Sequence, residues 1–460
     1  MNTTAQQSRF SVTRLRADVA GRVVERDDPG YDDARRVFLP SVDRRPAAIV
    51  KPADAGDVAR VVELARETGL ELAVRGGGHS NAGHGTTDGG LLLDLRGLTA
   101  LEIDADARVV RAAGGLTAGA VTAAAAPHGL AVGFGDTASV GIGGLTLGGG
   151  AGYLVRKHGL TIDHLIGAEV VTADGRVLEV GARSHPDLFW AIRGGGGNFG
   201  VVTRFVYRLH PVDTVTGGML ALPATPATLA GLVAEADAAP DELSIIANVL
   251  PAPPLPFVPA ELVGEPIVLA LLVHAGALAD GVRAVAPFRA LATPVADFVR
   301  PMQFNEMFTA PEQAAPARSV VRTFFSDDFD ETAARELLDR LRASAAPLAA
   351  AQIRVLGGAT ARVASDATAF AHRQRRLMLN VVAVYAAPEE AAVHEAWAEA
   401  AATALRRGED GAYVNFLGDE GRERTRAAYP GTTWDRLAEV KRRYDPENVF
   451  RLNQNVTPAS

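Results

Sequence analysis

Cysteine is absent from the 460 residues of this chain. Its absence excludes disulfide bonds, thiolate metal sites, iron–sulfur clusters and cysteine nucleophiles. Long apolar runs are absent as well: no stretch of ~18 uncharged apolar residues would span a membrane, and the N-terminus has no apolar core of signal-peptide length. We therefore expect a cytoplasmic protein without a membrane partner.

A basic tract is also missing. The formal net charge is -8, the sequence pI is about 5.7, and the charged residues are interspersed along the chain. Because no segment would neutralise a phosphate backbone, nucleic acid is not an expected partner. The hydrophobic share of 48% in a chain of this length favours a globular protein of two or more domains.

Glycine, by contrast, is abundant and clustered. The chain has 47 glycines, and four clusters come before residue 201, at residues 76–78, 141–144, 148–152 and 194–200. Glycine has no side chain, so backbone N–H groups at these places can approach a phosphate closely. Tight turns and close strand packing are the alternative, but they explain isolated glycine pairs better than four clusters. We therefore predict a cofactor that carries phosphate.

The last cluster contains the spacing G-x-G-x-x-G, at Gly195, Gly197 and Gly200. In a Rossmann turn this motif follows a strand and begins a helix. Here the helical segment DLFWAIR precedes the glycines, and the β-rich segment VVTRFVYRL follows them. Because the order is reversed, we reject a Rossmann site at this position.

Local patterns predict short strands and helices up to about residue 212. Residues 47–80 have the pattern of a β-α-β unit, in which Asp54 caps the helix and Gly69 ends it. A second helix is expected from Thr117 to near residue 129. Hairpins are expected at residues 101–114 and 168–181, the second with a type I′ turn at Asp174-Gly175.

The pattern changes after about residue 212. Strand-like runs such as LSIIANVL and MLNVVAVYA alternate with helical runs such as ETAARELLDRLRASA. The proline-rich residues 251–261 are expected to form a surface loop. This alternation predicts a separate α+β domain with an antiparallel sheet.

Histidine is the main reactive side chain, with ten in the chain. His79 directly follows three glycines, at the end of an expected strand, where a phosphate-binding loop would bring a cofactor. A lone histidine is more often structural, but these neighbours favour a cofactor contact. His84, five residues on, is expected to be a structural hydrogen-bonding partner.

The segment V-R-G-G-G-H-S at residues 74–80 resembles the flavin-attachment motif of the vanillyl-alcohol-oxidase superfamily, the PCMH-type FAD-binding proteins. More narrowly, the chain is similar over nearly its whole length to the berberine-bridge-enzyme-like branch, and to its hydroxynicotine-oxidising and polyketide-maturing members. The supporting segments are VGIGGLTLGGGAGYLVRKHGL at residues 140–160, HPDLFWAIRGGGGNFGVVTRF at 185–205, YVNF at 413–416 and YDPENVFRLNQNVTP at 444–458.

The resemblance implies a fold and its division into domains. The fold would be α+β, with a PCMH-type (non-Rossmann) FAD-binding domain of two subdomains and a substrate domain made of an antiparallel sheet with helices. Residues 1–212 and 411–460 would form the FAD-binding domain. Residues 213–410 would form the substrate domain, whose sheet would cover the flavin ring.

The resemblance also assigns cofactor-binding residues. His79 takes the position that bonds to the flavin 8α-methyl carbon. The other positions are Arg75, Gly76, Gly77, Gly78 and Ser80 in the pyrophosphate loop; Ser139, Val140, Gly143, Gly144 and Gly148 on the other side of the cofactor; Val201 near the adenine; Tyr413 and Asn415 on a C-terminal strand that returns to the flavin ring; and Asn453 in the segment that completes the FAD-binding domain.

Two of these positions bear on the chemistry. Many relatives bond the flavin a second time through a cysteine, and Thr137 takes that position here. A single histidyl bond is therefore implied, and large oligosaccharide substrates become less expected. A small valine at Val140 is associated in relatives with access of oxygen to the flavin, so we expect molecular oxygen to be the electron acceptor. No metal is expected.

The sequence leaves the catalytic base open. Tyr153 and Tyr413 are the leading candidates, ahead of Gln352, His372 and Tyr385, and for each of them packing in the core is the alternative. Gln352 takes the place at which a polyketide-maturing member of the branch carries an acid, which speaks against oxygen-transfer chemistry of that member's kind.

Three functions stay open. The leading prediction is an oxidase that transfers hydride from a small alcohol, amine or secondary metabolite to FAD and on to oxygen. The alternatives are a flavin-dependent monooxygenase or oxidative cyclase of secondary metabolism, and a non-catalytic flavin-binding protein. The protein would be a monomer or a homodimer.

Overall fold

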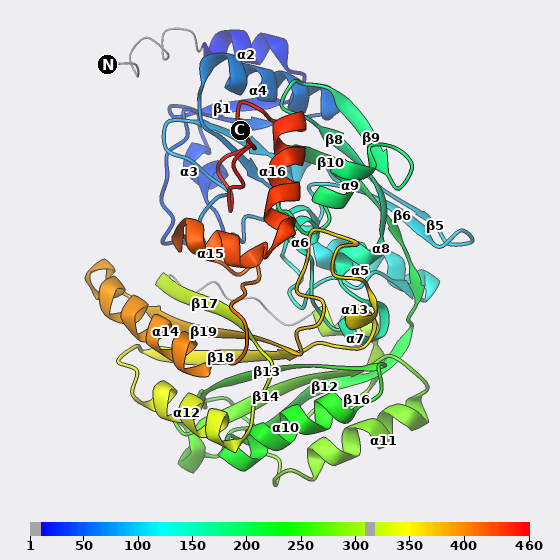
Figure 1. Cartoon of the computed structure of the whole chain (residues 1–460), viewed down its shortest axis with the longest axis vertical. Helices are drawn as coiled ribbons and strands as arrows, with labels where there is room; N and C mark the ends of the chain where they lie inside the picture. The colour runs from blue at the N-terminus through cyan, green and yellow to red at the C-terminus, as the bar shows by residue number, and fades with distance from the viewer. Residues whose placement is uncertain (1–10, 309–317) are drawn as a thin grey trace.

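The computed structural model describes residues 11–308 and 318–460. The N-terminal half and the C-terminal helices lie together at one end of the molecule, and the sheet formed by residues 214–385 lies at the other end (Figure 1). This mixture of helices with largely antiparallel sheets agrees with the predicted α+β class.

The first sheet is formed by N-terminal residues, with the strand order β1-β2-β4-β3. β2 and β3 run parallel to β4, whereas β1 is antiparallel to β2. The predicted β-α-β unit is present: Asp54 accepts a hydrogen bond from the Asp57 N–H where α4 begins, and Gly69 ends that helix with φ 68°. The elements are α2 (Val12–Asp18), β1 (Arg22–Glu25), α3 (Tyr31–Arg35), β2 (Ala48–Lys51), α4 (Ala55–Thr68), β3 (Leu72–Arg75) and β4 (Leu91–Asp94).

The second sheet is antiparallel throughout, with the order β5-β6-β10-β8-β9. Both predicted hairpins are present. The predicted type I′ turn at Asp174-Gly175 is wrong, because that turn needs positive φ at both residues, and only Gly175 has one, at 79°. A helix precedes residues 194–200 and a strand follows them, so the rejection of a Rossmann turn is confirmed. The elements are β5 (Leu101–Asp104), β6 (Val109–Ala113), α5 (Ala118–Ala125), α6 (Ile142–Gly148), α7 (Val155–His158), α8 (Thr161–His164), β8 (Leu165–Val171), β9 (Val177–Gly181), α9 (Pro186–Ala191) and β10 (Val201–Arg208), with β7 (Leu130–Ala131) paired to β11 (His210–Pro211).

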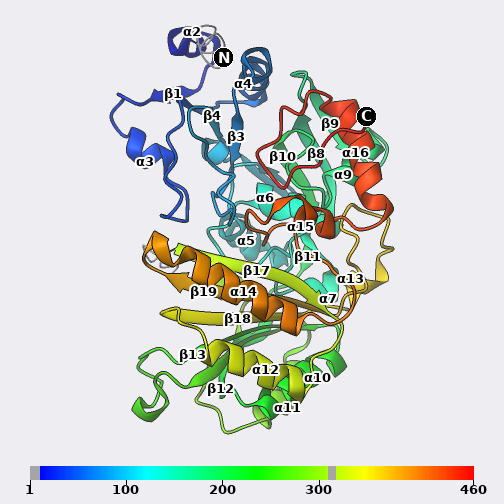
Figure 2. The same cartoon turned by 60° about the vertical axis from the view of Figure 1, so that its left-hand side comes forward.

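The third sheet is the predicted antiparallel one, with the order β15-β12-β14-β13-β18-β19-β17 and β16 also paired to β12. α10, α12 and α14 pack their apolar residues on one face of it. Figure 2 shows α10, α11 and α12 on the side of the sheet away from the N-terminal half. The elements are β12 (Thr214–Pro223), α10 (Pro226–Ala238), β13 (Leu243–Pro251), β14 (Pro266–His274), α11 (Leu278–Arg289), β15 (Ala296–Asp297), β16 (Arg300–Gln303), β17 (Arg318–Ser326), α12 (Glu331–Arg342), β18 (Leu348–Val355), α13 (Ala359–Arg362), β19 (Leu377–Tyr385) and α14 (Ala391–Leu405).

The opposite face of this sheet meets the N-terminal half. Ile246 and Val273 of the sheet pack in one cluster with Tyr153 and Leu154. A second cluster joins Phe325 and other sheet residues to the segment that follows the third glycine cluster. The sheet therefore covers the glycine-rich segments, which is the placement that the resemblance implies for a substrate domain. The domain boundaries themselves stay a prediction.

After β19 the chain returns to the N-terminal half through α15 (Gly421–Ala428) and α16 (Thr432–Tyr444). Trp434 of α16 shares a core cluster with Trp190 of α9. One prediction is wrong here: Tyr413 and Asn415 are not on a strand. The Phe416 N–H donates to the Tyr413 carbonyl and closes a turn, and the two predicted side chains bond to the glycine-rich segment instead of extending a sheet.

Short 3-10 helices lie at Leu95–Gly97, Ala126–His128, Ala260–Leu262, Phe304–Phe308 and Pro388–Glu390. Within residues 11–308 and 318–460, no helix has both the length and the apolar character that crossing a bilayer requires. The same residues hold no group of three or more histidine or carboxylate side chains arranged to bind a metal ion.

Candidate cofactor and active site

A cavity of about 620 Å³ opens where the glycine clusters, the third sheet and the C-terminal segment meet. Its lining comes from residues 72–85, 135–151, 196–202, 413–417 and 450–454, together with Phe38, Leu39, Leu95, Gly114 and Arg354. Most of the predicted cofactor-binding residues are in this lining: Arg75, Gly76, Gly77, Gly78, His79, Ser80, Thr137, Val140, Gly143, Gly144, Val201, Tyr413, Asn415 and Asn453.

Two glycine clusters touch at the wall of the cavity. A Cβ atom on Gly77 would lie 2.2 Å from the Gly141 nitrogen, and one on Gly141 would lie 2.1 Å from the Gly77 nitrogen. The two backbones therefore pack with no room for a side chain on either residue. Gly144 and Gly197, by contrast, have no atom within 4 Å of an added Cβ, so they face open space in the cavity.

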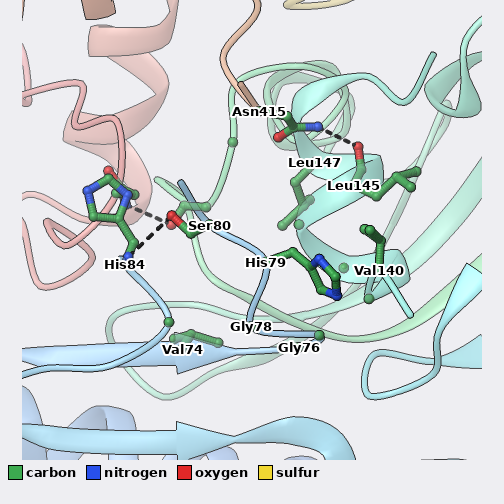
Figure 3. Close-up of a pocket in the computed structure, with 18 of the residues that line it drawn as sticks. Val74, Gly76, Gly78, His79, Ser80, His84, Val140, Leu145, Leu147 and Asn415 are labelled. Atoms are coloured by element: carbon green, nitrogen blue, oxygen red, sulfur yellow. Dashed lines mark hydrogen bonds between the residues drawn. The ribbon is translucent and has the colours of Figure 1, made fainter. Parts of the chain in front are cut away.

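His79 lies in the loop that follows β3, and its ring is held on two sides. Its Nε2 lies 2.8 Å from Ser139 Oγ, and the Phe38 ring stacks on it with centroids 3.9 Å apart. Figure 3 shows the imidazole pointing toward Val140 at the cavity wall. Ser139, which was expected to line the cofactor, is not itself in the cavity lining but positions the histidine that is.

Arg75 is a buried support of this loop. Its guanidinium makes an ion pair with Asp94 at 2.8 Å and donates to the carbonyls of Arg36 and Ala34. Asp94 also binds Arg96. Arg75 therefore fixes the start of the glycine loop. Its guanidinium binds protein groups and not a phosphate.

His84 is the second histidine of the lining. Its backbone N–H donates to Ser80 Oγ at 3.2 Å, a contact that Figure 3 also draws. Burial, with the positive charge of Arg44 adding to it, lowers the pKa of His84 to about 4. The imidazole is therefore neutral near pH 7. The Ser80 contact uses the backbone of His84 and not its ring, so the structural role expected for this histidine stays a prediction.

The C-terminal turn closes the cavity from the opposite side. The Gly150 N–H donates to Tyr413 Oη at 2.7 Å, and Asn415 Nδ2 donates both to Tyr413 Oη and to the Leu145 carbonyl. An added Cβ on Gly148 would lie 2.0 Å from Asn415 Oδ1. The space left by the missing side chain of Gly148 is therefore filled by Asn415 and not by a cofactor. Burial raises the pKa of Tyr413, which keeps its phenol neutral.

A buried ion pair joins residues 196–202 of the lining to residues 450–454. Lys441 Nζ lies 2.6 Å from Asp445 and donates to the carbonyls of Asn198 and Phe450. Asp445 in turn accepts the N–H groups of Val449 and Phe450. Because Asn198 and Phe450 belong to these two segments, the ion pair fixes the C-terminal segment, with Asn453, against residues 196–200.

Comparisons with known proteins agree with this geometry. The FAD binding domain family matches residues 46–181, and the family described as berberine and berberine-like matches residues 412–457. (R)-6-hydroxynicotine oxidase of Paenarthrobacter nicotinovorans is 31% identical over 453 residues, which cover 96% of this chain and 97% of that protein. The chain belongs to the berberine-bridge-enzyme-like family of FAD-linked oxidoreductases. An uncharacterized FAD-linked oxidoreductase of Bacillus subtilis (strain 168) has the same identity and coverage.

Solved structures of the family show the same fold. 6-Hydroxy-D-nicotine oxidase from Arthrobacter nicotinovorans superposes with a TM-score of 0.87 at 28% identity, covering 98% of this chain and all of that one. Glucooligosaccharide oxidase from Acremonium strictum, described with a 6-S-cysteinyl, 8α-N1-histidyl FAD, has a TM-score of 0.83 at 25% identity and covers 97% of this chain and 99% of its own. The predicted PCMH-type α+β fold is confirmed.

The cavity fits the FAD of this family. Its volume lies within the range of about 300–1,000 Å³ that ligand pockets occupy. Gly144 and Gly197 leave space where a side chain would intrude. His79 stands in the wall of the cavity.

Most of the residues predicted as a possible base lie outside the cavity lining. Tyr153 packs edge-on against Phe308 in the core, and burial raises its pKa. His372 Nε2 donates to the Ala427 carbonyl at 3.1 Å, and its ring stacks on Phe325. Tyr385 packs against His394. Gln352 binds Asn248 and Arg354. Of these candidates, only Tyr413 lines the cavity.

Sequence reasoning missed two charged residues of the lining. Asp136 and Arg354 form an ion pair of 2.8 Å, and Asp136 is the sole carboxylate among the lining residues of the described chain. A signal for Asp136 existed, since it is an isolated charge beside a glycine-rich segment. For Arg354 there was none, because its partner is 218 positions away.

Proposed function

We propose that this protein is an oxidase whose FAD is bonded to His79 alone, and that it oxidises a small alcohol, amine or secondary metabolite with molecular oxygen as the acceptor. The observation that carries the proposal is the placement of His79 in the cavity wall, with Ser139 at its Nε2 and the touching glycine clusters beside it.

The single bond follows from the composition of the chain. A second bond of the thioether kind needs a cysteine, and the chain has none. Thr137 lines the cavity at the position that carries this cysteine in doubly bonded relatives, and its hydroxyl lies 3.4 Å from Asp136. A threonine hydroxyl is not activated as a thiolate is, so the attachment depends on His79.

When bound, FAD would accept a hydride from a C–H bond of the substrate. The protein would bind and orient the substrate and provide the electrostatic environment. Tyr413, with a raised pKa and two N–H donors at its oxygen, has a proton to donate and is suited to orient a substrate oxygen or nitrogen. Asp136 is the group suited to receive a proton that the substrate loses.

Oxygen as the acceptor is supported by Val140. This small side chain lies in the cavity wall next to the ring of His79 (Figure 3). Val140→Leu should slow reoxidation in air after anaerobic reduction by dithionite, with reduction itself unaffected. Slow reoxidation of the unaltered protein would instead indicate a dehydrogenase.

Acid precipitation of the purified protein tests the attachment. Flavin absorbance should stay with the pellet, and His79→Ala should release it to the supernatant. His84→Ala is the matched control, because it removes the other histidine of the cavity lining and should leave the attachment intact. Release of the flavin from the unaltered protein would contradict the covalent bond but not the binding of FAD. Absence of flavin absorbance even after reconstitution would overturn the whole proposal.

A further inference from the structure

Arg354 is a buried cation at the cavity, and its charge has no part in the proposed function. It lies on β18, on the face opposite the core that Ile353 and Val355 enter with α10, α12 and α14. Its side chain is 5% exposed, whereas that of its partner Asp136 is 19% exposed. Asp136 belongs to the loop after β7, so the ion pair joins the third sheet to the glycine-rich half.

Stability alone does not explain this ion pair. A buried ion pair contributes little net stability, because the cost of desolvating both charges offsets their attraction. Arg156 joins the same two parts of the molecule through carbonyls alone, donating to Leu356 and Ala239 at 2.7 and 2.9 Å. The difference is that Arg354 and Asp136 both line the cavity, where their charges meet a ligand.

The guanidinium of Arg354 has donors left for such a ligand. Its Nε donates to Gln352 Oε1 at 2.9 Å, its Nη1 to the Ala151 carbonyl at 2.7 Å and its Nη2 to Asp136 at 2.8 Å. A guanidinium carries five N–H groups, so one on each terminal nitrogen has no partner among the described residues. Arginine binds carboxylates and other oxyanions through such groups.

Gln352 supports Arg354 without cancelling its charge. Its Nε2 donates to Asn248 Oδ1 at 2.9 Å, which turns its Oε1 toward Arg354 and toward Asn380. Asn248, Gln352 and Asn380 stand in cross-strand register on β13, β18 and β19. A glutamate at 352 would place a second carboxylate beside Arg354, so the amide keeps this end of the cavity from becoming negative.

Aromatic rings lie beside Arg354 at the cavity. The Phe416 ring centroid lies 5.3 Å from Arg354 Cζ, and the Tyr413 ring packs edge-on against Phe416 with centroids 4.9 Å apart. Both aromatic residues line the cavity. A flat apolar body would therefore find a wall next to the cation.

We infer that Arg354 is the anion-binding residue of the substrate pocket, and that the substrate is a small aromatic molecule with a carboxylate or phenolate group. The oxyanion binds the free N–H groups of Arg354, and Asp136 is the resident counter-ion with which it competes. This inference rests on the proposed function, because it names the substrate class of the same site.

Calorimetric titration of the FAD-loaded protein with benzoate, and with benzamide as its uncharged isostere, tests the inference. Benzoate should bind at least about tenfold more tightly than benzamide, and Arg354→Gln should remove this preference. Gln352→Glu, which replaces one amide by one carboxylate, should weaken benzoate about tenfold, and Asp136→Asn should strengthen it by a similar factor. Opposite effects of the two exchanges are the signature of an anion site.

Arg156→Gln is the matched control, because it removes a buried arginine that joins the same parts of the molecule outside the cavity lining. It should leave the preference for benzoate unchanged. Flavin absorbance and the thermal midpoint show that each variant is folded. Equal affinities for benzoate and benzamide in a protein that holds FAD would overturn this inference alone. A protein without FAD would overturn the proposed function instead.

Discussion

The contact between Gly77 and Gly141 allows a sharp test of how the two glycine clusters pack at the cavity wall. In Gly77→Ala the new Cβ would lie 2.2 Å from the Gly141 nitrogen, 2.9 Å from its Cα and 3.0 Å from the Ser139 carbonyl oxygen. All three atoms are backbone, so no flexible side chain can move aside. The two loops must separate to accept the methyl group.

The cost follows from this geometry. Inserting a methyl group into a tightly packed place costs about 1–3 kcal/mol, and Gly77 has no left-handed backbone angle that would add strain. Because Ser139 lies in the displaced loop and holds His79, separation should also disturb flavin attachment. We therefore expect Gly77→Ala to lower both the thermal midpoint and the ratio of bound flavin to protein.

Gly144→Ala is the matched exchange. Gly144 lies within α6 and no atom comes within 4 Å of an added Cβ, so the free protein should be as stable as before or gain about 0.5–1 kcal/mol from helix propensity. The methyl group would enter the cavity, and flavin loading should fall without loss of stability. Circular dichroism of the apoprotein and flavin absorbance after reconstitution separate the two effects. Unchanged stability and loading in Gly77→Ala would refute the reasoning.

Three further predictions concern single side chains. Ser139→Ala removes a hydrogen bond to His79 worth about 1 kcal/mol and should slow flavin attachment about fivefold. The growth of acid-stable flavin absorbance during reconstitution measures the attachment rate. An unchanged rate would contradict the positioning role of Ser139. Lys441→Met leaves the buried Asp445 without its cation and should lower the free energy of unfolding by about 3–5 kcal/mol. Chemical denaturation measures it, and a loss below about 1 kcal/mol would mean that the pair is dispensable. Burial lowers the pKa of His158 to about 3, so below about pH 6.5 the unfolded chain binds a proton that the folded chain does not. The free energy of unfolding therefore falls as the pH is lowered. His158→Phe should flatten this fall in thermal midpoints recorded from about pH 7 to about pH 4, and an equal slope in both proteins would rule the residue out.

The features that the sequence determined by itself are local. The three glycines before His79 are contiguous, the cap and end residues of α4 are written into its own segment, and the turn at Gly175 needs only its two neighbours. Backbone conformation at these places depends on residues a few positions apart, so the pattern predicts the element. The family resemblance was visible for the same reason, because its motifs are short and unbroken.

Only the tertiary structure decided which side chains share the cavity. Tyr153 lies near the glycine-rich segment in the sequence, yet it packs in the core, because the direction of a side chain depends on what covers it. Gln352, proposed as a base, proved to hold Arg354. The pairing of Asp136 with Arg354 arises because the third sheet folds over a loop 218 positions earlier in the chain. Contacts at that separation depend on how the elements pack, and no local pattern encodes them.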